Sequence, residues 1–143
     1  MVQLKRQYRS DLQQLPDMRA FVRAACQQVW QKPADTETIH RLELAVDEAV
    51  TNIILHSYQG QKDQPLELII EADAEQAGVT LWHGGRGFDP QAAPPPVFDG
   101  SRESGFGLYL IQQSVDDVQY FREEHGRHGV RLIKKRNQLH RGD

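Results

Sequence analysis

The sequence predicts an α+β fold, a two-layer sandwich in which helices cover one face of a mixed, mostly antiparallel sheet. Three observations carry this prediction. The chain has 143 residues, of which 38% are hydrophobic, and this suits a single domain over residues 1–143 with one core. Apolar residues recur at helical spacing in two early segments and alternate with polar residues in two later ones. The short polar connection "DAEQ" between the alternating segments is typical of a hairpin.

Two helices are expected after a short first strand, "QLKRQY". The first helix begins near Pro16 and Asp17, residue types that favour a helix start. The second helix is expected to begin at Asp35 or Thr36, either of which can cap it, and to extend to about His56. Its apolar face recurs at helical spacing and comprises Ile39, Leu42, Val46, Ala49, Val50 and Ile53.

Strands are expected next from Leu66 and from Gly78, where apolar and polar residues alternate. Further along, "GLYLIQQSVD" predicts a third helix, and "DVQYF" and "VRLIKK" predict two last strands around the turn "EEHGRHG". Residues 89–104, before the third helix, have no regular hydrophobic pattern, contain a proline run and are bracketed by glycines. We therefore expect a flexible connection there.

Composition excludes several classes of protein. The formal net charge is -3 with both signs mixed along the chain, which argues against direct binding of nucleic acid. The single cysteine, Cys26, excludes an intrachain disulfide and a zinc site built from cysteines. No stretch approaches the roughly 20 apolar residues of a membrane span, and the N-terminus has no hydrophobic signal core. We therefore expect a cytoplasmic protein without membrane contact.

Three polar residues recur in the second half of the second helix. Glu48, Asn52 and His56 are each four residues apart and would lie in line on one side of it. A glutamate can accept a proton from an attacking hydroxyl group, and an asparagine carbonyl oxygen is a hard ligand that suits Mg²⁺. On this segment alone, an ordinary solvated helix face is the simpler explanation.

Two pairs of glycines flank residues 89–104. Gly85 and Gly87, in "HGGRGFDP", follow a strand at a place where the backbone needs positive φ or a ligand comes close. A plain loop explains this pair equally well. Gly105 and Gly107, in "SGFGLYLI", directly precede a helix, where backbone N–H groups bind phosphate well. A flexible hinge is the alternative for the second pair.

The three motifs in this order resemble those of the GHKL ATPase superfamily, and within it the small RsbW-like anti-sigma-factor serine kinases. "VDEAVTNIILHSY" is similar to the N box of that family, "GGRGFDP" to its first glycine box, and "ESGFGLYLIQQSVDDVQY" to its second. The resemblance extends from the first helix to the last strand. It implies a Bergerat-type fold with a site for ATP and Mg²⁺.

The resemblance also implies roles for individual residues. Glu48 would be the general base and Asn52 the Mg²⁺ ligand. Gly85 and Gly87 would lie against the base and sugar of the nucleotide.

The second glycine box would serve the phosphates. Gly105 and Gly107 would approach them, and Leu108 is assigned with these glycines to the nucleotide site. Residues 89–104 would be the ATP lid, which closes over bound nucleotide. Arg102, near the end of the lid, would meet a phosphate or an acidic partner surface, and a solvated arginine is the alternative.

Two positions depart from the family pattern. His83 stands where the first glycine box usually has an aspartate that accepts a hydrogen bond from the adenine amino group. A neutral histidine can accept that bond through one ring nitrogen, so His83 is retained as a nucleotide-binding residue. His128 stands where a threonine usually lies near the nucleotide.

Two functions therefore remain open. The resemblance implies a serine/threonine-protein kinase of a bacterial partner-switching system. It would use ATP and Mg²⁺ to phosphorylate a STAS-type anti-anti-sigma protein and would otherwise bind a sigma factor, and a homodimer is compatible with it. The alternative is a module of the same family that binds its protein partners but binds ATP poorly or not at all. Glu48 and Asn52 favour the kinase, whereas His83 favours the alternative.

Overall fold

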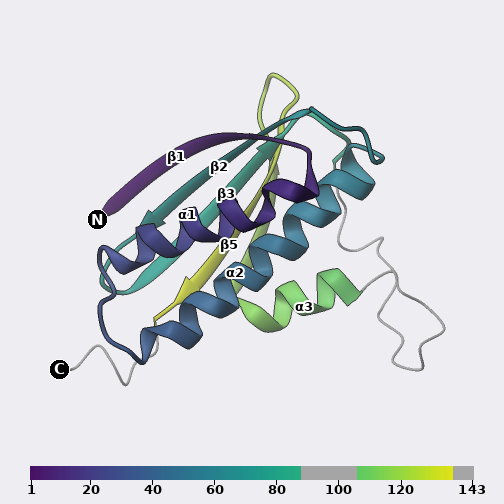
Figure 1. Cartoon of the computed structure of the whole chain (residues 1–143). Coiled ribbons are helices and arrows are strands. Elements are labelled where there is room, and N and C mark those ends of the chain that lie inside the picture. The colour runs from purple at the N-terminus through teal and green to yellow at the C-terminus, as the bar shows by residue number, and fades with distance from the viewer. Residues whose placement is uncertain (88–105, 137–143) are drawn as a thin grey trace.

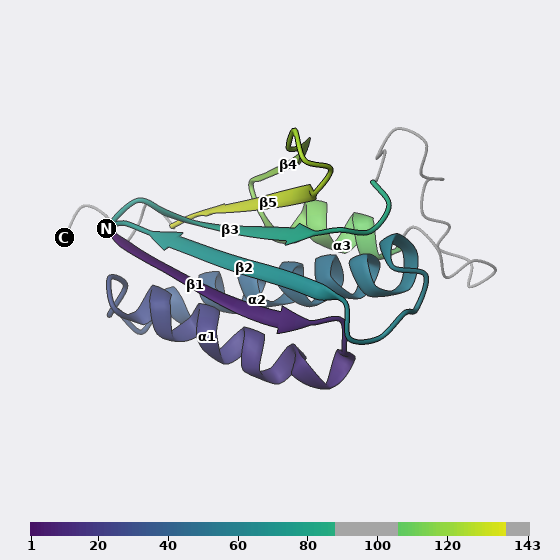
Figure 2. The same ribbon diagram turned by 90° about the horizontal axis from the view of Figure 1, so that it is seen from above.

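A computed structural model of the chain describes residues 1–87 and 106–136. In these ranges a five-stranded sheet is covered on one face by three helices (Figure 1) (Figure 2). The predicted two-layer α+β sandwich is thus confirmed. The expected lid, residues 89–104, lies outside the described residues, as do Arg102 and Gly105. The helical elements are the short 3-10 turn η1 (Leu12–Gln14), α1 (Leu15–Gln27), α2 (Asp35–Asn52), the π-helical turn η2 (Ile53–Ser57) and α3 (Phe106–Ser114).

The strands of the sheet have the order β1-β2-β3-β5-β4. They are β1 (Val2–Arg9), β2 (Pro65–Ala72), β3 (Gln76–His83), β4 (Asp117–Arg122) and β5 (His128–Lys135). The sequence predicted a mixed, mostly antiparallel sheet, and all neighbouring strands within the described ranges pair antiparallel. The hairpins β2-β3 and β4-β5 impose this direction on their two pairs because a tight turn reverses the chain.

The core lies between the sheet and the helices. The predicted alternation is confirmed in β2, where Leu66, Leu68 and Ile70 are fully buried and the residues between them are partly exposed. The helix α2 is central to the helical layer and contacts α1, α3 and β5. Its predicted apolar face is buried throughout. Among the helices of the described ranges, none combines the length and the apolar character that a bilayer crossing requires.

The beginning of α2 differs from the prediction. Ala34 occupies the N-cap position without a side-chain capping bond, so neither Asp35 nor Thr36 caps this helix. Instead the Asp35 carboxylate, which is 1% exposed, accepts hydrogen bonds from the Arg136 guanidinium at 2.9 and 2.8 Å. It also accepts one from the Lys32 backbone N–H at 3.2 Å. Because Arg136 directly follows β5, this ion pair joins the start of α2 to the end of a central strand.

Loss of one partner of this buried ion pair is expected to destabilise the fold, because the other charge stays buried without compensation. Asp35→Ala should lower the free energy of unfolding by about 3–5 kcal/mol in urea denaturation at neutral pH. Glu37→Ala is the matched control, since Glu37 pairs with Arg41 at 3.2 Å on the exposed face of α2. The control should cost about 0.5 kcal/mol or less. Equal effects of the two substitutions would contradict the structural role assigned to Asp35.

Candidate functional site

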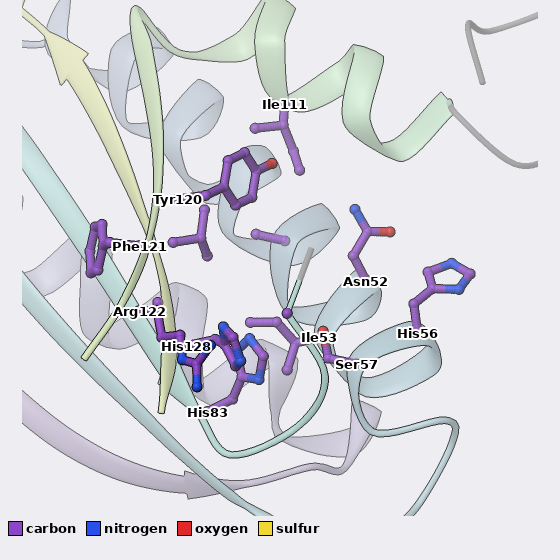
Figure 3. Close-up of a pocket in the computed structure, with 14 residues that line it drawn as sticks. Asn52, Ile53, His56, Ser57, His83, Ile111, Tyr120, Phe121, Arg122 and His128 are labelled. Atoms are coloured by element: carbon purple, nitrogen blue, oxygen red, sulfur yellow. The ribbon is translucent and has the colours of Figure 1, made fainter. Parts of the chain in front are cut away.

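A cavity of about 500 Å³ opens between the end of α2, the helix α3 and the ends of β3, β4 and β5 (Figure 3). One part of its wall is apolar and consists of Ala49, Ile53, Ile111, Tyr120, Phe121 and Val130. The remainder is polar or glycine and consists of Asn52, His56, Ser57, His83, Gly87, Arg122, His128 and Gly129. A concave surface that combines apolar and polar groups is the usual wall of a small-molecule site.

The π-helical turn η2 shapes one side of this cavity. The backbone N–H of Tyr58 donates to the carbonyl oxygen of Ile53 at 2.8 Å, a bond that spans five residues instead of four. Ser57 is the last residue of this turn, so its carbonyl oxygen is available to another segment. It accepts the backbone N–H of Arg86 at 2.9 Å, and this bond fixes the loop after β3 against the end of α2.

The glycine loop after β3 lies close to its neighbours. A Cβ atom on Gly85 would lie 2.6 Å from the Ser57 carbonyl oxygen, and one on Gly87 would lie 2.6 Å from Cε1 of His128. The sequence analysis attributed these glycines to positive φ or to close approach of a ligand. Positive φ at glycine occurs at other described positions, Gly60 and Gly126. In the described part of the chain, the chain's own backbone and the His128 ring come close to these glycines, and their contact with a ligand stays a prediction.

His83 ends β3 and is 5% exposed. Its Nδ1 accepts a hydrogen bond from the backbone N–H of Gly85 at 3.1 Å. His128 is its partner in the register of β3 and β5, and the two rings stack with centroids 5.9 Å apart. Tyr58 packs edge-on against His83 with centroids 5.8 Å apart. Burial, and secondarily the nearby His128, lowers the pKa of His83 to about 4, so its imidazole is neutral near pH 7.

The predicted catalytic pair lies at the C-terminal end of α2. Asn52 is the last residue of the helix and its side chain lines the cavity, as Figure 3 shows. Glu48 lies one turn earlier, is half-buried and does not belong to the cavity wall. Burial raises the pKa of Glu48, and the carboxylate of Asp47 raises it further. The predicted polar line therefore reaches the cavity, but only its later members form the wall.

Asp47 forms an ion pair with Arg19 of α1. Its Oδ2 accepts a hydrogen bond from Nη1 of Arg19 at 2.9 Å, whereas its Oδ1 is buried and has no hydrogen-bond partner in the described part of the chain. Glu43, one turn before Asp47 on α2, accepts two hydrogen bonds from Arg23 at 2.7 and 3.2 Å. These ion pairs join α1 to α2 on the side that carries Asp47.

The other predicted residues are placed less completely. Gly107 and Leu108 lie in the first turn of α3, and Leu108 is not among the described residues that line the cavity. Sequence reasoning did not assign Tyr120, Arg122 or Ile111 to the site. Tyr120 and Arg122 are two residues apart on β4, and such a pair shares one face of a strand. The sequence shows that they share a face but not which cavity this face meets.

No cluster of three or more His, Cys, Asp or Glu side chains suited to a metal ion occurs within residues 1–87 and 106–136. The single amide oxygen of Asn52 would therefore need oxygen ligands from a bound molecule to complete a coordination shell. Mg²⁺ is commonly held in this way, by one or two protein ligands together with phosphate oxygens and water.

Comparison with known proteins agrees with this geometry. The model of the family described as the histidine kinase-like ATPase domain matches residues 8–134. The chain belongs to this family. The resemblance drawn from the three motifs is thereby confirmed, because the match includes α2, the glycine loop and α3.

Several known proteins are similar to this chain. The serine-protein kinase RsbW of Listeria innocua is 29% identical over 96 residues, which cover 62% of this chain and 61% of that protein. RsbW of Oceanobacillus iheyensis is 30% identical over 92 residues, with 58% of each chain covered. RsbW of Staphylococcus epidermidis is 28% identical over 99 residues, covering 63% and 62%. The matched part spans about three fifths of these relatives' length.

The close approach at Gly85 gives a test of the loop. Gly85→Ala is expected to lower the free energy of unfolding by about 1–3 kcal/mol, because the added methyl group meets backbone atoms that cannot turn away. Gly84→Ala is the matched control, since its Cβ would lie 3.8 Å from the Tyr58 hydroxyl oxygen, an ordinary contact. Thermal and urea unfolding of both variants measure the difference. A Gly84→Ala variant as unstable as Gly85→Ala would show that the contact with Ser57 is not the cause.

Burial of neutral His83 makes the stability of the fold depend on pH. Its folded-state pKa of about 4 lies below the ordinary value of 6.5, so the unfolded state binds the proton first as the pH falls. The contribution of His83 to the free energy of unfolding is complete above about pH 6.5. It is lost as the pH falls towards about 4, a change of about 3 kcal/mol. Urea unfolding of wild type and His83→Gln across this window should show the loss in wild type alone. An NMR titration midpoint of the His83 ring near about 6.5 would contradict it.

Proposed function

We propose that this chain is a magnesium-dependent serine/threonine-protein kinase whose phosphoryl donor binds in the cavity at the end of α2. The observation that carries this proposal is the position of Asn52 in the wall of a cavity of about 500 Å³, one helical turn after the half-buried Glu48. The similarity to RsbW serine-protein kinases supports the same activity. ATP is the phosphoryl donor that the family implies.

The cavity suits a nucleoside triphosphate in size and in the chemistry of its wall. Ala49, Ile53 and Val130 offer apolar surface to a flat base. The amide oxygen of Asn52 would be the protein ligand of Mg²⁺, with the phosphates supplying further oxygens. The bound metal and triphosphate would supply the transferable phosphoryl group and neutralise its charge. Gly107 and Leu108, at the start of α3, are proposed to bind the phosphates together with Gly105, which precedes them in the sequence. Arg102 is proposed to approach the phosphates or a partner.

Glu48 is proposed as the general base that takes the proton from the substrate serine. A base works best when its pKa lies near the working pH. Burial and the Asp47 carboxylate both raise the pKa of Glu48 above the ordinary value of a glutamate. The raised pKa therefore favours proton acceptance by the Glu48 carboxylate. Asn52 lies at the end of the same helix. The pair thus combines a base and a metal ligand on one rigid element.

The protein partners are proposed from the relatives. The substrate would be a STAS-domain anti-anti-sigma protein, and in its absence the chain would hold a sigma factor, in the bacterial cytoplasm. A homodimer is part of this proposal. The formal charge of -3 gives no support to direct binding of nucleic acid.

A second function is favoured by one observation. The His128 ring lies so close to Gly87 that a side chain on this glycine would clash with it, and it stacks on His83. Two imidazoles therefore lie side by side in the cavity wall. A binding module of the same family that binds its protein partners without nucleotide is consistent with this arrangement. Calorimetric titration with Mg²⁺ and a purine nucleoside triphosphate distinguishes the two functions. Saturable binding supports the kinase, and no heat at millimolar ligand supports the binding module.

The catalytic pair gives the test of the kinase. Glu48→Gln should slow phosphoryl transfer to the partner protein by about 10²–10⁴-fold while nucleotide binding is retained, because only proton acceptance is lost. Asn52→Ala should weaken binding that depends on Mg²⁺ as well. Transfer of a γ-phosphate label is followed on a gel, and affinity by calorimetry. Glu37→Gln, on the exposed face of the same helix, should behave as wild type. Undiminished transfer by Glu48→Gln would reject the assignment.

A further inference from the structure

His83, one of two imidazoles in the cavity wall, presents a hydrogen-bond donor. The backbone N–H of Gly85 can only donate, so Nδ1 of His83, which accepts it at 3.1 Å, carries no proton. The neutral imidazole therefore carries its proton on Nε2. In the part of the chain that the structure describes, Nε2 makes no hydrogen bond, and the residue lines the cavity. A ligand that reaches His83 therefore meets an N–H group.

The neighbours of His83 keep this arrangement in place. Turning the ring or moving its proton to Nδ1 would break the bond to Gly85. Adding a second proton would place a charge in a site that is 5% exposed, with the His128 ring stacked on one side and Tyr58 on another. The carboxylate of an aspartate at this position would instead present only acceptors.

A purine nucleotide bound in this cavity would point one particular edge at His83. In Figure 3, Asn52 and His56 lie on the side of the pocket towards the start of α3, and His83 and His128 lie on the opposite side beyond Ile53. If Asn52 serves the phosphates, as the proposed function requires, the base extends away from them. The sugar is attached at N9 of a purine, and the edge farthest from N9 carries the 6-substituent.

We propose that His83 makes the site select a purine with a 6-oxo group, as in inosine or guanosine nucleotides, over a 6-amino purine such as ATP. This inference rests on the proposed function, because it uses the placement of the phosphates at Asn52. A 6-oxo group accepts the Nε2–H bond. A 6-amino group would face it donor to donor.

The test compares ATP with ITP, which carries an oxo group in place of the amino group at position 6. With wild-type protein and Mg²⁺, calorimetry should show tighter binding of ITP by about tenfold to a hundredfold, the cost of one unpaired buried donor. GTP should follow ITP if the cavity also accepts a 2-amino group. This comparison needs no variant and so does not depend on whether a changed protein folds. Equal binding, or tighter binding of ATP, overturns the inference and would place the base against another group such as His128.

Two variants assign the preference to this residue. His83→Asp should reverse it, since one carboxylate oxygen can accept the Gly85 N–H while the other accepts the amino group of ATP. His83→Gln should bring the two affinities together, because an amide can present either a donor or an acceptor. His40→Asp is the matched control, because it makes the same change on the exposed face of α2 and should keep the wild-type ratio. An unchanged ratio in His83→Asp overturns the inference.

The same experiment separates this inference from the proposed function. Preferential binding of ITP without phosphoryl transfer to any serine substrate would reject the kinase and still support the selection by His83. Transfer from ATP with no preference for ITP would support the kinase and reject the selection. Failure of all three triphosphates to bind would reject both and leave the binding module.

Discussion

The site depends on one backbone contact, the hydrogen bond from Arg86 N–H to the Ser57 carbonyl oxygen at 2.9 Å. It exists because Ser57 ends the turn η2, where carbonyl groups have no partner within the helix, and because Gly85 has no side chain to keep the loop and this turn apart. This bond packs the loop after β3 against the turn that follows α2, and the cavity lies beside this contact. The chain therefore uses its first glycine pair to pack its own elements together, and the shape of the cavity follows from that packing.

Burial of an ionisable ring is the second constraint on the site. A histidine at the inner end of an apolar cavity remains neutral because desolvation disfavours its charged form. Once neutral, it has one donor and one acceptor, and the loop takes the acceptor. The hydrogen-bonding character of the cavity is thus set by a backbone amide two residues along the chain. Substituting a histidine for a carboxylate at such a place changes what the site offers, even if the size of the cavity stays similar.

Much of the fold could be predicted from local pattern, and much of the site could not. Helical spacing located α1 and α2, and alternation located β2 and β3, because each pattern records which side of one element is buried. The motif spacing also located Glu48 and Asn52 on one helix. The partner of Asp35 was missed because Arg136 lies 101 residues away. The pairing of His83 with His128 depends on the register of two strands, which local pattern does not give. The hydrogen bond from Arg86 to Ser57 depends on the turn η2, which the apolar spacing of α2 does not indicate.

The ion pair of Asp35 with Arg136 has a consequence for how α2 responds to a ligand. Helices commonly fray at their ends, but here a tertiary contact holds the first turn and another holds the turn that follows the last residue. A helix fixed at both ends is rigid, so its side chains lose little further conformational freedom when a ligand binds. The entropic cost of positioning Glu48 and Asn52 has then been met during folding, which leaves more of the contact energy for affinity.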